Sequence, residues 1–353
     1  MKTGLLVTPA FLLLVFSIGA GTDAGWLHTD GRWIKDAGGN VVTLRGVNMF
    51  VRLQNEQAKF AAAKAAGANV IRLMLWKQDV ETPGTNAPGF DQSGLAAIDR
   101  AVGWAHDAGM YVILEQQIWS PKVEPAPAAF FSDPALQAQW LAMWRVLVDR
   151  YKNDPTVIGI DPMNEPYSVS GVTVPDPMGT WETIVKNAVN DLRPRNPHLI
   201  FFIEGWGPRT TPGFRDVAFL QQPNTVYSDH IYYKDAYPVH AWATAYSTGD
   251  LERGKALFSQ LADKRWTTYT DKGIPVWLGE IGFSTTSPHW REQMADELAL
   301  LDERGIGYAL FCCGVSHWKL EWDMVDASYG LTTVGRLYSE HITSAGRPRK
   351  QLN

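Results

Sequence analysis

The chain has 353 residues, of which 45% are hydrophobic and 20% are charged, and its formal net charge is −5 at pH 7. This composition is typical of a globular protein, and the length allows a large buried core. The sequence lacks the basic footprint of a nucleic-acid-binding protein, so we expect no nucleic-acid partner.

Residues 1–24 predict a secretory signal peptide. A positive start at Lys2 is followed by apolar residues at 4–7 and 11–16, and then by small residues at 19–21. We expect cleavage near Ala20 or Ala24. The apolar stretch is short for a bilayer span, and an uncleaved membrane anchor is the alternative. Nothing later in the sequence is apolar enough to cross a membrane, so we expect a secreted protein with no membrane partner after cleavage.

Residues 26–40 predict a small β-hairpin with Gly and Asn turns, which we expect to close the floor of the main fold. The first strand of that fold is expected at residues 41–48. A unit then repeats: a helix-period segment, a glycine that ends it, and a short β-rich run. The glycine is in each case suited to the left-handed conformation just past a helix, and it occurs at Gly67, Gly109, Gly273 and Gly305.

The connections that follow the strands are much longer than these turns, as in parallel α/β units. Two helix starts are also predicted, at Asp133-Pro134 and at Ser287-Pro288. Eight strand candidates alternate with helices, which favours one closed (β/α)₈ TIM barrel over residues 25–353 rather than an open doubly wound sheet. The strands are expected near Val42, Val70, Val112, Val157, Ile200, Val226, Val276 and Tyr308.

Polar side chains stand at the predicted carboxyl ends of these strands. The apolar run 156–160 is followed by Asn164-Glu165-Pro166, where Pro166 has no N–H to continue a strand. Glu280 ends a second apolar run. In a barrel, such side chains point into the active site. The full set is Arg72, Gln116, Gln117, Asn164, Glu165, Glu204, Asp229, His230, Tyr232 and Glu280.

Two carboxylates on opposite walls of one cleft indicate glycoside hydrolysis, in which one protonates the leaving oxygen and the other attacks the sugar or activates water. The 15 Trp of the sequence agree with this chemistry, because flat aromatic rings stack on sugar faces. For each ring a position in the core is an equal alternative. The candidates for the cleft are Trp76, Trp119, Trp206, Trp318 and Trp322.

Taken in strand order, Arg72, Asn164-Glu165-Pro166, His230-x-Tyr232 and the Glu280 strand resemble glycoside hydrolase family 5, the cellulase family. The resemblance covers roughly residues 44–318. It implies a retaining mechanism with Glu165 as acid/base and Glu280 as nucleophile. It further implies that Arg72 and Tyr232 keep Glu280 ionised, that Asn164 binds the sugar 2-hydroxyl, and that His230 orients Glu165.

The sequence departs from the family pattern at two strand ends. The third strand ends in Gln116-Gln117 where the family has a histidine, and an amide can bind a sugar hydroxyl but cannot titrate. We therefore expect Gln117 to bind substrate. The eighth strand lacks the family's tryptophan, and the nearest candidates, Trp318 and Trp322, follow in the next loop. These departures concern the identity of the sugar.

Glu204 is a third strand-end carboxylate and a rival to Glu165 or Glu280. We rank it lower because the family pattern does not use it, and expect Trp206 to offer a sugar platform. Asp161 is expected to brace an arginine or a backbone group. Taken alone, Arg72 could be a core ion-pair partner and His230 a buried histidine.

We therefore predict a secreted, monomeric endo-acting β-1,4-glucanase whose partner is a β-linked polysaccharide. A β-mannanase or another β-glycan hydrolase would use the same residues. A non-catalytic glycan-binding barrel is the alternative of another class. We expect no cofactor and no metal, since the histidines and cysteines lack metal-ligand spacing. The adjacent Cys312 and Cys313 are expected as small buried residues, with a vicinal disulfide as the alternative.

Overall fold

A computed structural model describes residues 25–51, 56–76, 92–117, 127–207, 213–232, 241–314 and 323–345. The predicted signal peptide lies outside these residues and stays a prediction. No helix within the described ranges combines the length and the apolar character needed to cross a membrane.

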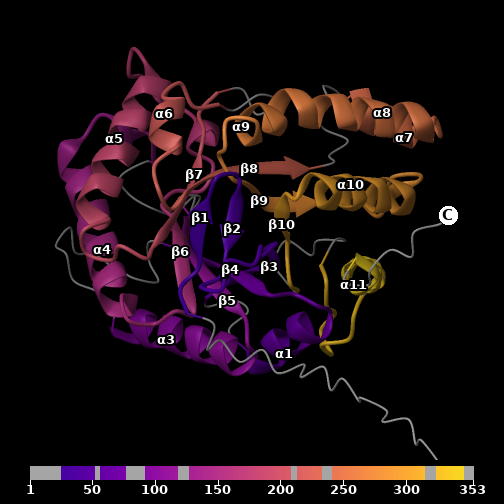
Figure 1. Cartoon of the computed structure of the whole chain (residues 1–353), viewed down its shortest axis with the longest axis horizontal. Helices are drawn as coiled ribbons and strands as arrows, with labels where there is room; N and C mark the ends of the chain where they lie inside the picture. The colour runs from indigo at the N-terminus through magenta and orange to yellow at the C-terminus, as the bar shows by residue number, and fades with distance from the viewer. Residues whose placement is uncertain are drawn as a thin grey trace, which may run out of the picture.

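Eight parallel strands close into a barrel in the order β10-β3-β4-β5-β6-β7-β8-β9, which confirms the predicted TIM barrel. Helices surround the barrel on its outside (Figure 1). The barrel strands are β3 (Arg45–Phe50), β4 (Val70–Trp76), β5 (Tyr111–Gln117), β6 (Val157–Asp161), β7 (Ile200–Glu204), β8 (Thr225–Tyr232), β9 (Val276–Gly282) and β10 (Gly307–Leu310).

The helices follow the strands as expected for βα units. The α-helices described are α1 (Gln57–Ala65), α3 (Gln92–Asp107), α4 (Pro134–Tyr151), α5 (Pro177–Leu192), α6 (Val217–Leu220), α7 (Ala241–Ser247), α8 (Leu251–Ala262), α9 (Thr268–Thr270), α10 (Trp290–Arg304) and α11 (Thr333–Ala345). Short 3₁₀ segments are η1 (Pro127–Phe131) and η2 (Pro166–Ser168), and η3 (Asp263–Thr267) is a π-helical turn.

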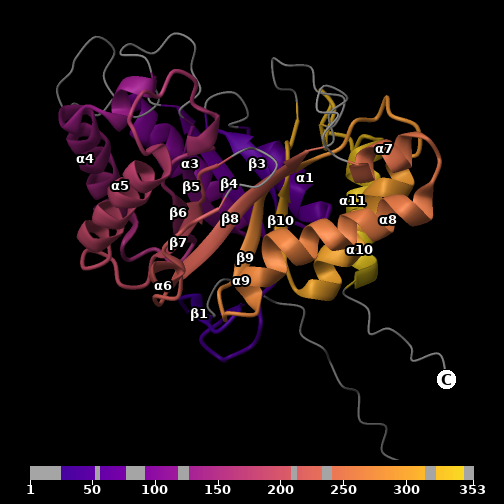
Figure 2. The same cartoon turned by 90° about the horizontal axis from the view of Figure 1, so that it is seen from above.

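The predicted N-terminal hairpin is formed by β1 (His28–Asp30) and β2 (Trp33–Lys35), which pair antiparallel. It lies at one end of the barrel (Figure 2). Leu27 and Ile34 of this segment pack in one buried cluster with inward residues of the barrel strands such as Val70 and Ile113. The hairpin therefore seals the barrel floor, as expected.

The first barrel strand begins later than predicted. The sequence indicated a strand over residues 41–48, but β3 begins at Arg45. Val41 and Val42 instead pair with the hairpin: Val41 forms a bridge with Lys35, and the N–H of Val42 donates to the carbonyl of Ile34 at 2.8 Å. Their β-branched side chains fit an extended segment, so their pattern does not show which partner strand they take.

Local signals at helix ends were largely correct. Asp133 caps α4, accepting a hydrogen bond from the Ala135 N–H at 2.8 Å. All four predicted helix-ending glycines have positive φ, and Gly305 with φ 69° caps α10. The start of α10 is the exception, since the helix begins at Trp290 after a left-handed His289 rather than at Pro288.

The two cysteines are free thiols in the structure, and both are buried. The Sγ atom of Cys312 donates to Oδ1 of Asp323 at 3.2 Å, and burial raises the pKa of Cys313 to about 12. The pair thus fills the core after β10 as small side chains.

Helix α10 carries a buried carboxyl group that links stability to pH. Glu297 is 1% exposed, and its Oε1 accepts a hydrogen bond from Gln293 at 2.7 Å. Burial raises the pKa of Glu297 to about 8. Because the folded state binds this proton more tightly than the unfolded chain, the stabilising contribution is complete below about pH 4.5 and is lost as pH rises toward 8.

We predict that Glu297→Gln stabilises the protein increasingly as pH rises, by up to about 1.4 kcal/mol per pH unit between the two pKa values. The glutamine keeps an acceptor for Gln293 but carries no charge. Urea unfolding of variant and wild type at pH 5 and pH 8 measures the difference. Glu303→Gln, at an exposed position of the same helix, is the control. An equal difference between Glu297→Gln and wild type at both pH values would contradict the prediction.

Candidate active site

The site lies at the carboxyl ends of the barrel strands, one layer above the apolar floor. Along each strand, alternate side chains point into the barrel. Floor residues such as Val70, Ile113 and Phe202 are therefore followed two positions later by polar ones. These polar residues are Arg72 on β4, Glu115 on β5 and Glu204 on β7.

Arg72 is the centre of this polar layer. It is fully buried, and its guanidinium reaches carboxyl groups on four other strands. Its Nη1 and Nη2 atoms also donate to the amide oxygens of Asn48 and Asn164 at 3.1 and 2.9 Å. The carboxyl contacts are Glu280 at 2.8 Å, Asp161 at 2.9 Å, Glu204 at 3.3 Å and Glu115 at 3.8 Å.

The space for this cluster depends on Gly279 of β9. A Cβ atom there would lie 2.9 Å from Nε2 of His230 and 3.3 Å from Nε of Arg72. Both distances are shorter than ordinary carbon contacts. The absence of a side chain at Gly279 thus lets the arginine and the histidine lie side by side in the barrel.

One guanidinium faces four carboxyl groups, and burial acts on the pKa of Arg72 and on the pKa values of three of its partners. Burial raises the pKa of Glu115 well above its usual range, and Arg72 only partly opposes this rise. Burial likewise raises the pKa of Glu204 and that of Asp161. For Arg72, burial acts to lower the pKa, but the surrounding carboxylates outweigh it and hold the pKa well above the usual value. The arginine therefore stays charged, and burial opposes the ionisation of the carboxyl groups around it.

The two predicted catalytic glutamates converge on His230. The carboxyl of Glu165, at the tip that follows β6, has its Oε1 3.0 Å from His230 Nδ1, and its Oε2 accepts from Ser168 Oγ at 3.1 Å. Glu280 of β9 accepts from Arg72 at Oε1 and from the Tyr232 hydroxyl at Oε2. Carboxylate oxygens of Glu165 and Glu280 lie within 4.8 Å of each other.

The end of β8, which carries His230, is held by a buried ion pair. Asp229 accepts at Oδ1 from Arg265 Nη2 and at Oδ2 from Trp266 Nε1, both at 2.7 Å. The same Arg265 donates to the carbonyl of His230 at 3.1 Å. Arg265 and Trp266 belong to the π-helical turn η3, so this turn fixes the backbone that positions the histidine.

Aromatic side chains form a cluster at the mouth of the barrel. Trp76 at the end of β4 stacks on Phe50, with ring centroids 5.6 Å apart. Phe311 follows β10, is 8% exposed and meets Tyr232 edge to face at 5.9 Å. Trp206 is partly exposed and lies against Phe131. The predicted sugar contacts Trp119, Trp318 and Trp322 lie outside the described residues.

Gln117, the predicted substrate-binding amide, is the last residue of β5 and is 6% exposed. Its Oε1 has no hydrogen-bond partner within the described part of the chain. This oxygen can therefore accept a hydrogen bond from a ligand hydroxyl.

Asp161 forms an ion pair with Arg72 at 2.9 Å, as expected.

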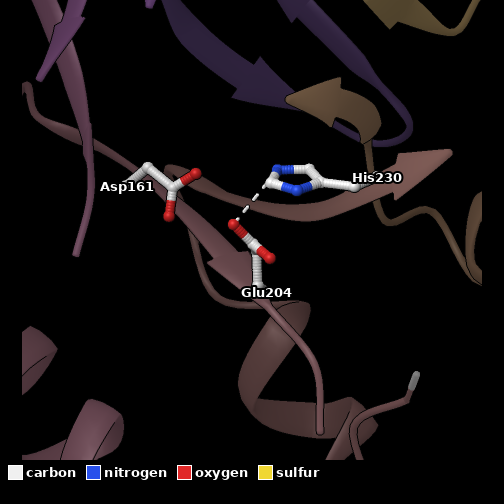
Figure 3. A group of neighbouring side chains, drawn as sticks. All are labelled: Asp161, Glu204 and His230. Atoms are coloured by element: carbon white, nitrogen blue, oxygen red, sulfur yellow. Dashed lines mark ion pairs between the residues drawn. The ribbon is translucent and has the colours of Figure 1, made fainter. Parts of the chain in front are cut away.

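Two groups of described residues have the spacing of metal ligands: Asp161 with Glu204 and His230, which face one another in Figure 3, and Glu165 with His230 and Glu280. Nη2 of Arg72 lies 2.9 Å from Asp161 and 3.3 Å from Glu204. A cation held by Asp161 and Glu204 would therefore lie directly against the guanidinium, and we assign no metal ion to this group.

Sequence reasoning missed several residues of the site. Asn48 and Glu115 bind or approach Arg72, Arg265 holds the β8 end, and Phe311 stands at the eighth strand end where the family's tryptophan was found to be missing. Glu115 could have been predicted from the alternation of side chains along β5, because it lies two positions after the inward-facing floor residue Ile113 and therefore also points into the barrel. No sequence pattern marked Arg265, because it lies in the π-helical turn η3, far along the sequence from the β8 end that it contacts.

The family model for cellulase, glycosyl hydrolase family 5, matches residues 35–316 of the chain. The chain belongs to this family. It is therefore a glycoside hydrolase, and both the predicted family and the predicted class of enzyme are confirmed.

Known relatives are distant in sequence. An endoglucanase of Paenibacillus polymyxa is 24% identical over 302 residues, which cover 75% of this chain and 73% of the relative. The major extracellular endoglucanase of Xanthomonas campestris pv. campestris is 26% identical over 51% of this chain and 38% of its own length. The chain thus spans well under half of that second relative.

Solved structures share the fold. A β-glucanase of Saccharophagus degradans in complex with cellotetraose has a TM-score of 0.70 at 19% identity, covering 91% of this chain and 94% of that one. An endogalactoceramidase has a TM-score of 0.68, also at 19% identity, covering 90% of this chain and 84% of its own. At this identity the likeness concerns the fold alone.

We predict that Arg72→Met destabilises the protein by about 3–5 kcal/mol at pH 7.5, because it leaves buried carboxylates without their cation. Without the arginine, their folded-state pKa values rise further above the unfolded values. The deficit relative to wild type should therefore shrink as pH falls and the carboxylates take up protons.

Urea unfolding at pH 5 and pH 7.5 measures the deficit of Arg72→Met. Arg145→Met is the matched control, because Arg145 pairs with Asp191 with 40% of its side chain exposed and should contribute about 1 kcal/mol or less. A deficit of Arg72→Met that is independent of pH would show that the buried charges do not cause it.

Proposed function

We propose that the protein is an endo-acting β-1,4-glucanase that cleaves β-glucans with retention of configuration. The observation that carries this proposal is the convergence of Glu165 and Glu280, whose carboxylate oxygens approach within 4.8 Å. Retaining glycosidases place their two carboxyl groups about 5 Å apart, whereas inverting enzymes leave room for a water between them.

Glu280 has the surroundings of the nucleophile. Arg72 donates to one oxygen at 2.8 Å and the Tyr232 hydroxyl to the other, so both oxygens of Glu280 act as hydrogen-bond acceptors and the carboxyl group is held in a fixed orientation. Burial raises the pKa of Tyr232 well above its usual range, and Glu280 adds to the rise. The tyrosine thus remains a hydrogen-bond donor while Glu280 attacks the anomeric carbon.

Glu165 has the surroundings of the acid/base. Its carboxyl is the more exposed of the two, at 18% against 5% for the side chain of Glu280, and so it can reach the leaving oxygen at the cleft edge. In the first step Glu165 protonates that oxygen as Glu280 forms a glycosyl ester. In the second step Glu165 takes a proton from water, which attacks the ester and releases Glu280. His230 orients Glu165 from 3.0 Å.

The remaining predicted contacts fit the sugar at the cleavage point. Oδ1 of Asn164 is held by Arg72 at 2.9 Å, which leaves its amide nitrogen to donate to the 2-hydroxyl. Gln117 offers its carbonyl oxygen to another hydroxyl. Trp206 and Trp76 offer aromatic faces for stacking, and Phe311 follows the eighth strand, where the family has a tryptophan that this sequence lacks. Trp119 and Trp318 remain predicted contacts.

The glucan assignment is supported by the endoglucanase relatives and by the β-glucanase structure that holds cellotetraose. A β-mannanase or another β-glycan hydrolase remains the alternative, since a β-xylosidase of Phanerodontia chrysosporium is also related at 24% identity. Secretion is supported by the N-terminal sequence and by the relative described as extracellular. We further propose that the enzyme acts as a monomer.

The experiment that tests the substrate compares soluble β-glucan, mannan, xylan and xyloglucan and sizes the products. We expect β-glucan to be cleaved fastest and to yield mixed oligosaccharides from internal cuts. A preference for mannan would refute the glucanase assignment, and release of single sugars alone would refute endo action. Binding of all four polysaccharides without any cleavage would support the non-catalytic barrel instead.

We predict that Glu280→Ala abolishes turnover, since no covalent intermediate can form without the nucleophile. An activated 2-fluoroglycoside should label Glu280 in the wild type, and mass spectrometry of peptides identifies the labelled residue. Label on Glu204 instead would overturn the assignment.

We predict that Glu165→Ala loses most activity on substrates with poor leaving groups, which need a proton to depart. Added azide should restore turnover of an activated glycoside, because it replaces water without requiring a base. NMR of the product should show a β-glycosyl azide. An α-product would contradict the retaining mechanism.

A further inference from the structure

Glu204 touches Glu165 from two sides. It ends β7 and is 1% exposed. Its Oε2 accepts a hydrogen bond from the backbone N–H of Glu165 at 3.0 Å. Its Oε1 lies 3.2 Å from Nε2 of His230, the ring whose Nδ1 contacts the Glu165 carboxyl. One buried carboxyl group thus contacts both the main chain of Glu165 and the ring beside its side chain.

The backbone of Glu165 depends on such a contact. Glu165 has φ 43° and ψ 57°, the left-handed conformation that residues with a Cβ rarely adopt. Such a conformation persists where the surroundings hold it in place. The following residue, Pro166, has no N–H. The turn is therefore fixed by the Glu165 N–H bond to Glu204 on one side and by the Ser168 N–H bond to the Glu165 carbonyl, at 2.8 Å, on the other.

Glu204 itself is placed too deep to act on the sugar. Its two oxygens face Arg72, His230 and the Glu165 main chain, whereas the Glu165 side chain keeps 18% of its surface exposed. The Glu204 side chain is 1% exposed, against 5% for Glu280, so we assign Glu204 to orienting its neighbours and not to a step on the sugar.

We propose that Glu204 is a positioning residue for the acid/base: as a hydrogen-bond acceptor, it fixes the left-handed turn that aims the Glu165 carboxyl at the leaving oxygen. The inference rests on the proposed function of Glu165. It assigns a role to the third strand-end carboxylate, which the family resemblance leaves unexplained.

Two substitutions separate the hydrogen bond from the charge. Glu204→Gln removes the ionisable group but keeps an oxygen that can accept the Glu165 N–H, and it gives up the acceptor that faces Arg72 Nη2 at 3.3 Å. Glu204→Asp keeps the charge but withdraws the acceptor by one carbon. If the hydrogen bond positions Glu165, the glutamine variant should keep this position and the aspartate variant should lose it.

The first readout is kcat/KM, which reports the steps up to the first irreversible bond cleavage, on cellotetraose and on 2,4-dinitrophenyl β-cellobioside. The dinitrophenolate leaves without being protonated, so cleavage of this substrate does not need a correctly positioned acid. We expect Glu204→Asp to lose about 100-fold on cellotetraose, as for a misplacement of about 1 Å, and far less on the activated glycoside. Glu204→Gln should keep the ratio of the two kcat/KM values close to that of the wild type, because a loss that comes from the missing Arg72 contact affects both substrates alike.

Glu115→Gln is the matched control. Glu115 is another fully buried carboxyl beside Arg72, at 3.8 Å, and no hydrogen bond joins it to Glu165 among the described residues. Any loss in this variant should be the same on the two substrates. Thermal unfolding identifies variants that are not folded.

The second readout is hydrogen exchange of the Glu165 amide, which needs no activity. Exchange should be slow in the wild type and in Glu204→Gln and faster in Glu204→Asp. Equal losses of Glu204→Asp on both substrates, or a kcat/KM ratio that shifts as far in Glu204→Gln as in Glu204→Asp, would overturn the role of Glu204. An unchanged amide exchange in Glu204→Asp would do so as well. A wild type that cleaves neither substrate would instead refute the proposed function. Exchange of the Glu165 amide would then still show whether Glu204 accepts a hydrogen bond from the Glu165 N–H.

Discussion

The buried guanidinium of Arg72 is the interaction on which the arrangement of the site depends. A positive charge inside a barrel has a high desolvation cost, and it is retained because four carboxyl groups and two amide oxygens surround it. These six partners come from five strands or the segments directly after them, since Asp161 and Asn164 both belong to the end of β6. Arg72 therefore holds the strand ends in fixed positions relative to one another, and Glu280 is one of the groups it holds.

The closed barrel makes this concentration of charge possible. The floor below the polar layer is a sealed apolar cluster that includes Leu27 and Ile34 of the N-terminal segment, so water is excluded from that side. Excluding water strengthens each ion pair and also raises carboxyl pKa values. The four carboxyl groups around one arginine therefore differ in how strongly burial is opposed by a nearby positive charge.

The sequence was sufficient to predict those parts of the fold and site that are encoded locally. Strand ends, helix-ending glycines and the Asn164-Glu165-Pro166 turn are each marked by adjacent residues, and the eight-strand order follows from their succession. The start of β3 was misplaced because Val41 and Val42 suit any extended partner. Glu115 and Asn48 were missed because their importance arises from meeting Arg72 across the barrel. Arg265 was missed because η3 reaches β8 through tertiary packing, which no local pattern reports.

The same distinction explains why the reaction is better determined than the sugar. The reaction depends on strand ends whose spacing the barrel fixes, whereas sugar preference depends on the surfaces above them. Phe311 offers a smaller ring than the tryptophan usual at the eighth strand, and it packs edge to face against Tyr232, the residue that bonds the nucleophile. Only one side chain, Tyr232, thus separates the ring at the eighth strand end from Glu280. The departure from the family pattern therefore lies within two contacts of the Glu280 carboxyl, and it is not confined to the outer surface of the barrel mouth.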